Sequence, residues 1–399
     1  MPPVTGRTYL AIPGPSVIPE RVLNAMHRVS PNIYQGDIID ITHRALDGLK
    51  QLAGTRHHVA IYIANGHGGW EAAITNMFSR GDKALGVGTG LFGVNWARTA
   101  QSMGVEIELL DFGRTAADPA RIEAALRADT ERKIKWVTLT QVDTASSVRN
   151  DVAAVRASID AAGHPALLAV DAIASLGCDE LRMDDWGIDL IVGASQKGLM
   201  LPPGLALLWL SDKALEAARI ADLATPYWSV LPRIGADEYW RLFGGTPPTQ
   251  HIYGLDEVLK MILVEEGLED TWARHRVLAR AIWTAFDAWG AGGSGIALNV
   301  RDPGARGHSV TAATIPGGGA GRLRAWLEQE AGVTLGIGLG MAMSHEPQYA
   351  DYLRIGHMGH VNAHMVMGVL GTMEAGMCAL GIPHGAGAVE AAARALSAA

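Results

Sequence analysis

Short apolar runs alternate with helical stretches through the middle of the chain, and this alternation constrains the fold more than any other feature. Apolar runs typical of strands occupy 105–110, 134–140 and 166–170, and helical periodicity occupies 120–127 and 152–162. Strands separated by single helices pair in parallel, with the helices on both faces of the sheet. The sequence therefore predicts an α/β fold built on a parallel sheet.

The length of 399 residues favours a large domain with a smaller partner over a single small core. We expect an N-terminal arm over 1–20, a large domain over 21–265 and a small C-terminal α/β domain over 266–399. The arm contains Ile12-Pro-Gly-Pro-Ser16, whose prolines and glycine prevent a regular helix. Within the large domain, 211–260 is expected to be largely irregular.

Composition and charge exclude several kinds of partner. The net charge is −8 without a lysine- or arginine-rich block, so we expect no nucleic-acid or acidic-membrane partner. The two cysteines, Cys178 and Cys378, cannot build a disulfide framework, and the start of the chain lacks the apolar core of a signal peptide. The most apolar late stretch, 364–382, contains Glu374, which favours a buried helix over a membrane span. We therefore expect a cytoplasmic protein.

Two of the buried strands end in residues of opposite chemistry. The run 166–170 is followed by Asp171, and the run 189–194 leads to Lys197. Ligands of open α/β sheets bind beyond the carboxyl ends of the strands, so we expect these two side chains to share a site. A lysine amine can form an imine with an aldehyde, and a carboxylate can keep a ring nitrogen protonated. Pyridoxal phosphate requires this combination.

A glycine-rich turn is a candidate anion site. The expected strand 58–63 is followed by Ala64-Asn-Gly-His-Gly-Gly69 and by a helix from Trp70. A helix N-terminus offers unpaired N–H groups, and glycines let an anion approach the backbone. An ordinary tight turn explains the pattern equally well. The spacing matches neither a P-loop nor a dinucleotide fingerprint, which disfavours a nucleotide.

Three further features bear on chemistry. Phe92 is expected in a glycine-flanked loop after a strand, where its ring could stack on a planar cofactor or fill a core. Arg354 stands among apolar residues, and such an arginine typically pairs with a carboxylate, either of a substrate or of a structural salt bridge. His357, His360 and His364 are close in sequence, but no familiar ligand set is completed around them, so we expect no metal.

These segments together resemble the class V aminotransferases, in particular the alanine–glyoxylate, serine–glyoxylate and serine–pyruvate aminotransferase group. The resemblance runs from residue 12 to residue 359, and its most specific parts are Val170-Asp-Ala-Ile-Ala-Ser175 and Gly193-Ala-Ser-Gln-Lys-Gly-Leu199. It implies a pyridoxal-phosphate enzyme of fold type I, with a mostly parallel seven-stranded sheet, that forms a homodimer with shared active sites. The implied reaction moves an amino group from a small L-amino acid, such as alanine or serine, to glyoxylate or pyruvate by a ping-pong mechanism.

The resemblance also implies roles for residues that contact the cofactor. Lys197 is the implied Schiff-base lysine, and Asp171 is the implied partner of the ring nitrogen. The phosphate is implied to bind the backbone amides of Gly66 and His67 and the side-chain amide of Gln196. Thr246 is implied to reach it from the second subunit.

Five other residues are implied to surround the ring and the substrate. Phe92 and Ile173 would lie on opposite faces of the ring, and Thr144 would lie near the ring oxygen. Arg354 would bind the α-carboxylate of the substrate, and Tyr34 would lie beside the substrate side chain.

Three positions depart from the family pattern, all where substrate side chains are expected. Asp143 replaces a common glutamate, Asn32-Ile-Tyr34 replaces an Asp-His-Arg triplet of the serine–glyoxylate branch, and Gly245 replaces a tyrosine. Tyr34 in place of an arginine argues against a second anionic group on the amino donor. The donor, the acceptor and the pathway therefore stay open.

Other functions compete with aminotransfer. A lyase or desulfurase of the same cofactor class is the main alternative, although a desulfurase needs a reactive cysteine on a mobile loop and neither cysteine fits. An NAD-dependent oxidoreductase would explain the sheet but lacks the required glycine spacing. A cofactor-binding regulator would need a DNA-binding segment, which the acidic chain does not offer.

Overall fold

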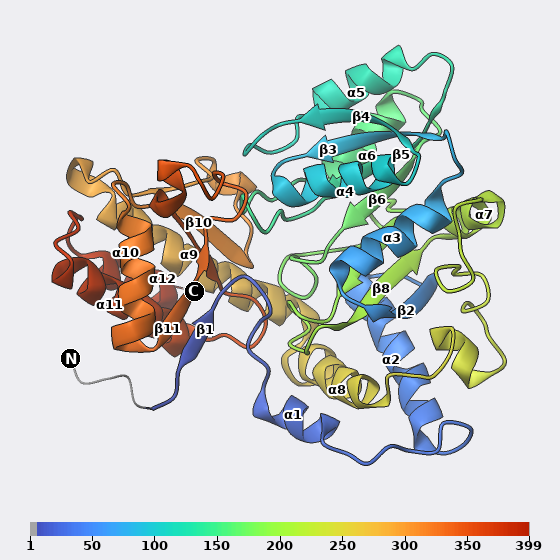
Figure 1. The fold of residues 1–399 in the computed structure, drawn as a ribbon, viewed down its shortest axis with the longest axis horizontal. Helices are drawn as coiled ribbons and strands as arrows, with labels where there is room; N and C mark the ends of the chain where they lie inside the picture. The colour runs from blue at the N-terminus through green and yellow to red at the C-terminus, as the bar shows by residue number, and fades with distance from the viewer. Residues whose placement is uncertain (1–5, 399) are drawn as a thin grey trace.

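The computed structural model describes residues 6–398 and divides them into a large and a small lobe, each built on one sheet (Figure 1). The sheet of the large lobe has seven strands in the order β2-β8-β7-β6-β5-β3-β4. Their bounds are β2 His58–Ala64, β3 Lys83–Gly88, β4 Glu106–Asp111, β5 Ile134–Thr140, β6 Leu167–Asp171, β7 Leu190–Ala194 and β8 Gly204–Leu210. Only β8 runs antiparallel to its neighbours, so the expected mostly parallel seven-stranded sheet is confirmed.

Helices cover both faces of this sheet, as the alternation in the sequence predicts. One face carries α3 Gly66–Met77, α4 Leu91–Ser102 and α7 Asp212–Ile220; the other carries α2 Asp37–Ala53, α5 Pro119–Ala128, α6 Val152–Ala161 and α8 Thr249–Lys260. Successive strand residues face opposite cores because side chains alternate along a strand: Leu168 and Val170 pack on one side of β6, and Ala169 packs on the other.

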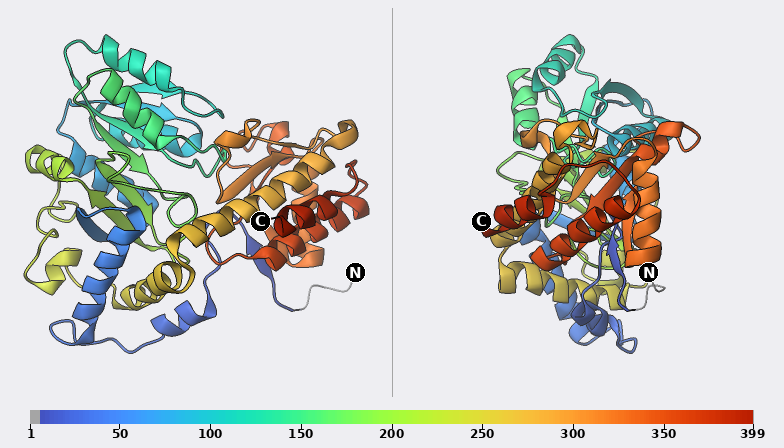
Figure 2. Two further views of the ribbon diagram at one scale, coloured as in Figure 1. Left: turned by 180° about the vertical axis from the view of Figure 1, so that it is seen from behind. Right: turned by 90° about the vertical axis from the view of Figure 1, so that its left-hand side faces the viewer.

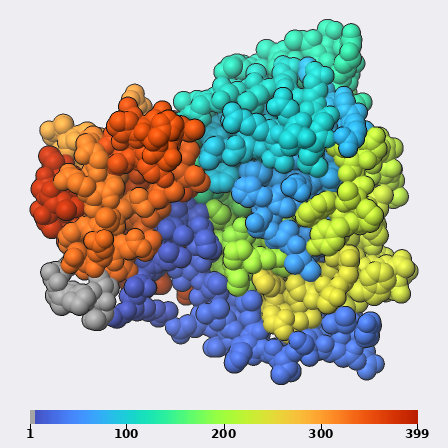
Figure 3. Space-filling model, viewed as in Figure 1, coloured from blue at the N-terminus to red at the C-terminus, as the bar shows by residue number. Residues whose placement is uncertain are grey.

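The small lobe has a five-stranded sheet in the order β1-β11-β12-β10-β9. Its strands are β1 Tyr9–Ala11, β9 Ala297–Leu298, β10 Val310–Thr314, β11 Val333–Ile337 and β12 Tyr352–Gly356. The N-terminal arm therefore adds its own strand, β1, which pairs in parallel with β11. Figure 3 shows the dark blue start of the described chain lying along the boundary between the two lobes. The first five residues of the expected arm lie outside the described part of the chain.

A long helix connects the lobes. The π-helix η2 Met261–Glu266 and Gly267 precede α9 Leu268–Trp289, which runs from the large lobe into the small lobe (Figure 2). The expected domain boundary after residue 265 thus lies near the end of η2. The remaining helices are α1 Glu20–Met26, α10 Gly319–Trp326, the π-helix η5 Leu327–Ala331, α11 Ala363–Ala379 and α12 Ala388–Ser397. Short 3-10 turns occupy η1 Tyr239–Phe243, η3 Ala291–Gly293, η4 Pro303–Ala305 and η6 Pro347–Asp351.

Two local predictions were wrong. Residues 211–260 are not largely irregular, because α7 begins where the Ser211 side chain accepts a hydrogen bond from the Ala214 N–H and its apolar side packs on the sheet. Phe92 lies in the first turn of α4 rather than in a loop, because the Asp143 carboxylate accepts a hydrogen bond from its backbone N–H. Both helix starts depend on oxygen acceptors that the apolar pattern does not reveal.

The most apolar late stretch forms α11 and contributes to the core of the small lobe. Its buried residues include Val366, Leu370 and Met373. No helix within residues 6–398 is long and apolar enough to cross a lipid bilayer.

Candidate active site

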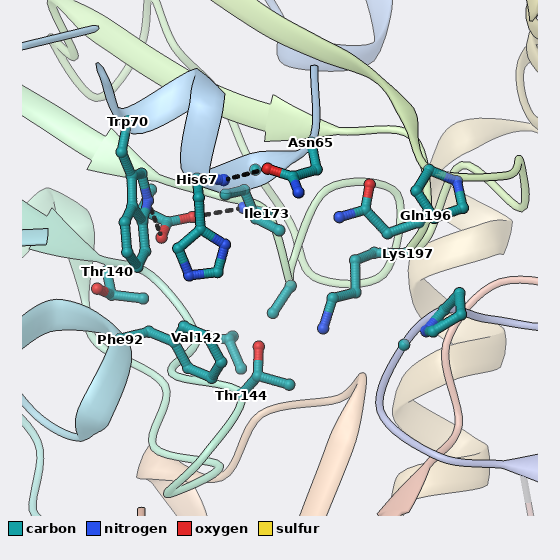
Figure 4. Close-up of a pocket in the computed structure, with 16 residues that line it drawn as sticks. Asn65, His67, Trp70, Phe92, Thr140, Val142, Thr144, Ile173, Gln196 and Lys197 are labelled. Atoms are coloured by element: carbon teal, nitrogen blue, oxygen red, sulfur yellow. Dashed lines mark hydrogen bonds between the residues drawn. The ribbon is translucent and has the colours of Figure 1, made fainter. Parts of the chain in front are cut away.

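A cavity of about 270 Å³ lies at the carboxyl ends of β6 and β7 (Figure 4). This position is the edge at which open α/β sheets bind ligands. The cavity brings together eight of the residues proposed from the sequence: Gly66, His67, Phe92, Thr144, Asp171, Ile173, Gln196 and Lys197. It is also lined by residues not proposed from the sequence: Gly14, Pro15, Asn65, Trp70, Thr140, Val142, Ala174 and Pro203.

Asp171, the last residue of β6, is a buried carboxylate with a fixed orientation. Only 3% of its surface is exposed. Its Oδ1 accepts a hydrogen bond from the Ile173 N–H at 2.8 Å, and its Oδ2 accepts one from Trp70 Nε1 at 3.0 Å. Burial raises the pKa of Asp171 to about 6, although both hydrogen bonds act in the opposite direction. The group is therefore ionised at neutral pH and can accept a further bond from a cationic N–H.

Lys197 follows β7 and extends its amine into the same cavity (Figure 4). Burial and the positive charge of Arg354 lower the pKa of this lysine to about 8, and the negative charge of Asp171 opposes them. An amine whose pKa is close to neutral has a much larger unprotonated, nucleophilic fraction than an exposed lysine. Lys197 is thus suited to attack a carbonyl carbon.

The N-terminal arm lies directly against Lys197. The Lys197 amine donates a hydrogen bond to the carbonyl oxygen of Pro13, and the Ser16 hydroxyl donates one to the backbone carbonyl of Lys197 at 2.7 Å. Gly14 has a φ of +101°, and a Cβ atom at this position would lie 2.6 Å from Lys197 Cε. Only glycine therefore allows the arm to pass this close to the amine.

We expect Lys197→Met to stabilise the cofactor-free protein at neutral pH. The folded pKa is about 8, below the ordinary value of 10.5, so the unfolded chain binds more protons between these two values. The stability of the wild type should therefore rise with pH across this window, and the unfavourable contribution of Lys197 should be largest below pH 8. At pH 7 the substitution should raise the free energy of unfolding by up to about 3 kcal/mol.

Urea unfolding of both cofactor-free proteins at pH 7 and pH 10 measures this effect. The advantage of Lys197→Met should shrink at the higher pH. Lys213→Met is the control, because Lys213 is exposed, and it should change stability little at either pH. An advantage of Lys197→Met that is equal at both pH values would contradict the lowered pKa.

The start of α3 forms one end of the cavity. The Asn65 side chain caps this helix and accepts hydrogen bonds from the N–H groups of His67 at 3.1 Å and Gly68 at 3.2 Å. The His67 amide proposed as an anion donor is therefore already bonded to Asn65 in this structure. A Cβ atom at Gly66 would lie 2.7 Å from Ile173 Cδ1, so a side chain here would displace the end of the Ile173 side chain. Asn65 is a further candidate for contacting an anion here.

Asp143 organises the opposite wall of the cavity. Its Oδ2 accepts hydrogen bonds from the N–H groups of Phe92 at 2.8 Å and Gly93 at 3.1 Å, and its Oδ1 accepts one from Ala145 at 2.9 Å. Burial raises the pKa of Asp143, and these hydrogen bonds oppose the rise. The residue that departs from the family pattern thus fixes the position of Phe92 rather than facing a substrate freely.

Arg354, on β12, is a buried cation without a carboxylate partner. Its side chain is 6% exposed, its Nε donates to the Ile337 carbonyl at 2.7 Å, and its Nη1 donates to the Thr144 carbonyl at 2.9 Å. Within residues 6–398 no carboxylate lies within ion-pair distance of the Arg354 guanidinium. Arg354 therefore does not form the structural salt bridge considered from the sequence with any described residue. Burial lowers the pKa of Arg354 to about 10. Arg354 does not itself line the cavity, but Thr144, whose carbonyl it bonds, does, and the positive charge of Arg354 lowers the pKa of Lys197, so the guanidinium lies near the cavity.

Besides Arg354, two other proposed residues do not line the cavity of a single chain. Tyr34 is 80% exposed, and Thr246 is also exposed. Within residues 6–398 no group of three or more His, Cys, Asp or Glu side chains is arranged to hold a metal ion. His357 is instead buried and hydrogen-bonded to the Thr311 hydroxyl at 2.9 Å.

Trp70 is the most important residue that the sequence reasoning missed. It lies one helical turn after Gly66 and His67, so it faces the same side of α3. A buried tryptophan usually needs a partner for its indole N–H, which is a usable sequence signal. The partner, Asp171, is 101 residues away in sequence, and this distance hid the contact.

Comparison with known proteins agrees with this geometry. The family model described as aminotransferase class-V matches residues 8–363. The chain belongs to the class V aminotransferases. Among these enzymes, it is 36% identical over 395 residues to the L-aspartate–glyoxylate aminotransferase of Paracoccus denitrificans, which covers 98% of this chain and 96% of the relative. It is 37% identical over 379 residues to the serine–glyoxylate aminotransferase of Methylorubrum extorquens, covering 92% of this chain and 90% of the relative.

Solved structures of aminotransferases share the fold. The ureidoglycine–glyoxylate aminotransferase of Bacillus subtilis superposes with a TM-score of 0.87 at 25% identity, with 99% of each chain covered. The pyridoxamine–pyruvate aminotransferase of Mesorhizobium loti superposes with a TM-score of 0.88 at 24% identity, covering 99% of this chain and 98% of the other. This class V chain therefore has the architecture of fold type I.

Membership of class V implies pyridoxal phosphate, and the cavity residues fit this group. The carboxylate of Asp171 and the amine of Lys197 match a ring nitrogen and an aldehyde. The absence of a Cβ atom at Gly66 keeps the α3 end of the cavity open. Two buried polar atoms at this cavity, Gln196 Oε1 and Thr140 Oγ1, have no hydrogen-bond partner within the described chain. Unpartnered buried polar atoms are unfavourable, so they indicate room for a polar ligand.

Proposed function

We propose that this aminotransferase uses pyridoxal phosphate to move the amino group of a small L-amino acid, alanine or serine, to glyoxylate or pyruvate. The observation that carries this proposal is the buried, carboxylate-free guanidinium of Arg354 beside the Asp171–Lys197 cavity. A buried unpaired cation is unfavourable unless a ligand supplies the anion. Amino acids and 2-oxo acids both carry such an anion, the α-carboxylate.

The cofactor and the residues of the cavity have separate chemical roles in the proposed reaction. When bound, pyridoxal phosphate supplies an aldehyde carbon and a cationic ring that withdraws electrons from the substrate α-carbon. Asp171 holds the proton on the ring nitrogen, because its buried negative charge favours the cationic ring. Lys197, once its amine is free, moves the proton to and from the α-carbon as a general base and acid.

The phosphate and the ring need separate supports. Gly66 and His67 at the start of α3, together with Gln196, are proposed to hold the phosphate, since a helix N-terminus favours an anion. For His67 this requires that its N–H exchange the Asn65 side chain for the phosphate, or share its bond between the two. Phe92 and Ile173 are proposed to hold the two faces of the ring, and Thr144 would contact its oxygen.

A single site would then serve both substrates in turn. The donor and the acceptor both have an α-carboxylate that Arg354 can bind, and the cavity of about 270 Å³ is close to the lower end, about 300 Å³, of ordinary small-ligand sites. Donor product must leave before the acceptor enters, so we expect ping-pong kinetics.

The active form is proposed to be a homodimer with shared sites. Thr246 and Tyr34 are exposed in the single chain, which is compatible with each contacting the site of the other subunit. In this arrangement Thr246 binds the phosphate, and Tyr34 lies near the substrate side chain.

A desulfurase is the weaker candidate within the same cofactor class. Such an enzyme needs a reactive thiol near the site, but Cys178 is buried in a small apolar cluster and burial raises its pKa to about 12. Cys378 is exposed on α11, and neither cysteine lines the cavity.

A two-step assay with purified protein and pyridoxal phosphate tests the proposal. Alanine, serine and aspartate are added separately, and the 2-oxo acid released is measured before glyoxylate is added. We expect alanine or serine to reduce the cofactor absorption band without an acceptor, and glyoxylate to restore the band and yield glycine. Oxo-acid release that requires both substrates at once would contradict ping-pong transfer, and aspartate as the fastest donor would contradict the proposed donor class.

A further inference from the structure

The Asp171 carboxylate is held by two donors of different kinds. The backbone N–H of Ile173 belongs to the strand end itself and bonds Oδ1 at 2.8 Å. The indole N–H of Trp70 comes from α3 and bonds Oδ2 at 3.0 Å. The first donor comes with the local turn, whereas the second depends on one side chain. Trp70 is therefore the part of this support that a substitution can remove selectively.

The indole of Trp70 is itself rigidly packed. Its exposed surface is 2%, its ring stacks on Trp96 with centroids 6.4 Å apart, and it meets His67 edge-on at 4.8 Å and Phe92 at 6.2 Å. A Cβ atom at Gly69, the preceding residue, would lie 3.0 Å from Val192 Cγ1, so α3 lies close against β7 here. The indole N–H thus has little freedom to turn away from Oδ2.

The charges around Asp171 make its ionisation sensitive to the hydrogen bond from Trp70. Burial favours the protonated acid, and the nearby carboxylate of Asp143 acts in the same direction, whereas the amine of Lys197 favours the anion. His67 is the other titratable side chain in this part of the cavity, and it packs on Trp70. A hydrogen bond to the charged form of a buried carboxyl group stabilises that form.

We propose that Trp70 is a positioning residue for the reaction, which holds Oδ2 of Asp171 in place and keeps this carboxylate ionised. The role rests on the proposed function, because Asp171 matters there as the partner of the cofactor ring nitrogen. Each oxygen of Asp171 accepts one hydrogen bond from the protein and retains capacity for another, so the indole does not block a ring N–H.

The chain supplies a matched control for this proposal. Trp96 is 1% exposed and stacks on Trp70, but its Nε1 has no hydrogen-bond partner within the described residues. Trp96→Phe and Trp70→Phe remove similar apolar volume from the same cluster. Only Trp70→Phe removes a hydrogen bond from Asp171, so a difference between them reports that bond rather than packing.

The direct test is the pKa of Asp171 in full-length, cofactor-free protein. The aspartate side-chain carboxyl carbons are labelled with ¹³C, the Asp171 resonance is identified by its loss in Asp171→Asn, and its shift is followed against pH. We expect the Asp171 pKa to rise by about one in Trp70→Phe and to stay near the wild-type value in Trp96→Phe. Trp70→Met, which also lacks a donor and adapts to irregular space, serves if the phenylalanine variant does not fold.

Each outcome decides between positioning and packing. A rise in the Asp171 pKa in Trp70→Phe but not in Trp96→Phe supports the positioning role. An Asp171 pKa in Trp70→Phe equal to that of the wild type, or equal rises in both variants, would overturn this role. The proposed function is tested separately by the two-step assay with wild-type protein. That assay can fail while the carboxyl titration succeeds, and the reverse also holds, so the two failures are distinguishable.

Discussion

Replacing Lys197 with alanine should lower the rate of both half-reactions by at least about 10³-fold. Among the described residues, Lys197 is the only lysine that lines the cavity. It follows β7, the strand that pairs with the Asp171 strand β6. The substitution removes both the nucleophile for the aldehyde and the base that moves the α-proton. Single-turnover measurements with the donor alone and then the acceptor alone separate these half-reactions.

The control for this experiment is Lys213→Ala, which removes an exposed lysine of the same lobe. It should retain the wild-type rate within about twofold, because surface substitutions usually have small effects. Cofactor binding should be measured in each variant, since the loss must occur in protein that still holds the cofactor. A Lys197→Ala protein that transfers amino groups within tenfold of the wild-type rate would refute the assigned role.

The central pair of the site was predictable because its positions follow from strand ends. Asp171 and Lys197 each follow an apolar run, and β6 and β7 are parallel neighbours in the sheet, so both side chains emerge at one edge. Phe92 and Thr144 come from loops and helix starts at the same edge, and the same argument brings them near the cavity. Periodicity was sufficient to predict that Asp171 and Lys197 share a site, whereas the role of Thr144 was predicted from the family resemblance.

The contacts that fix these side chains were not predictable in the same way. The bond between Trp70 and Asp171 depends on the direction of a side chain on α3, and the bond between Asp143 and Phe92 depends on how a distant loop meets α4. The contact of Pro13 with Lys197 depends on where β1 joins the sheet of the small lobe. Each arises from tertiary placement, which hydrophobic periodicity does not encode.

The departures from the family pattern also acquire different meanings in the structure. Asp143 accepts backbone N–H groups and is therefore part of the scaffold. Gly245 adopts a φ of +150°, a conformation that favours glycine over the family's tyrosine. Tyr34 is 80% exposed and does not line the cavity, so the proposed contact with the substrate side chain requires the second chain of the proposed homodimer. Of the three, only Tyr34 stays a candidate for direct contact with the substrate side chain.

Replacing Arg354 with lysine should lower kcat/KM for the amino donor by about 10²- to 10³-fold. The guanidinium uses Nε and Nη1 to bond the carbonyl oxygens of Ile337 and Thr144, which fixes its plane and leaves Nη2 without a protein partner in the described chain. A lysine keeps the positive charge but cannot bond both carbonyl groups and a carboxylate in this planar arrangement. The same loss should appear for the 2-oxo acid acceptor, because it carries the same carboxylate.

A donor without a carboxylate distinguishes binding from scaffolding. Ethylamine is alanine without its α-carboxylate, so wild-type protein should use it poorly, and Arg354→Lys should reduce its rate by less than about threefold. Arg322 is an exposed arginine of the same lobe, so Arg322→Lys should leave the rates with alanine and with ethylamine unchanged. If Arg354→Lys instead lowered the rates with alanine and ethylamine equally, Arg354 would act only as a link between β12 and the Thr144 loop. A loss confined to alanine would show that the guanidinium recognises the carboxylate itself.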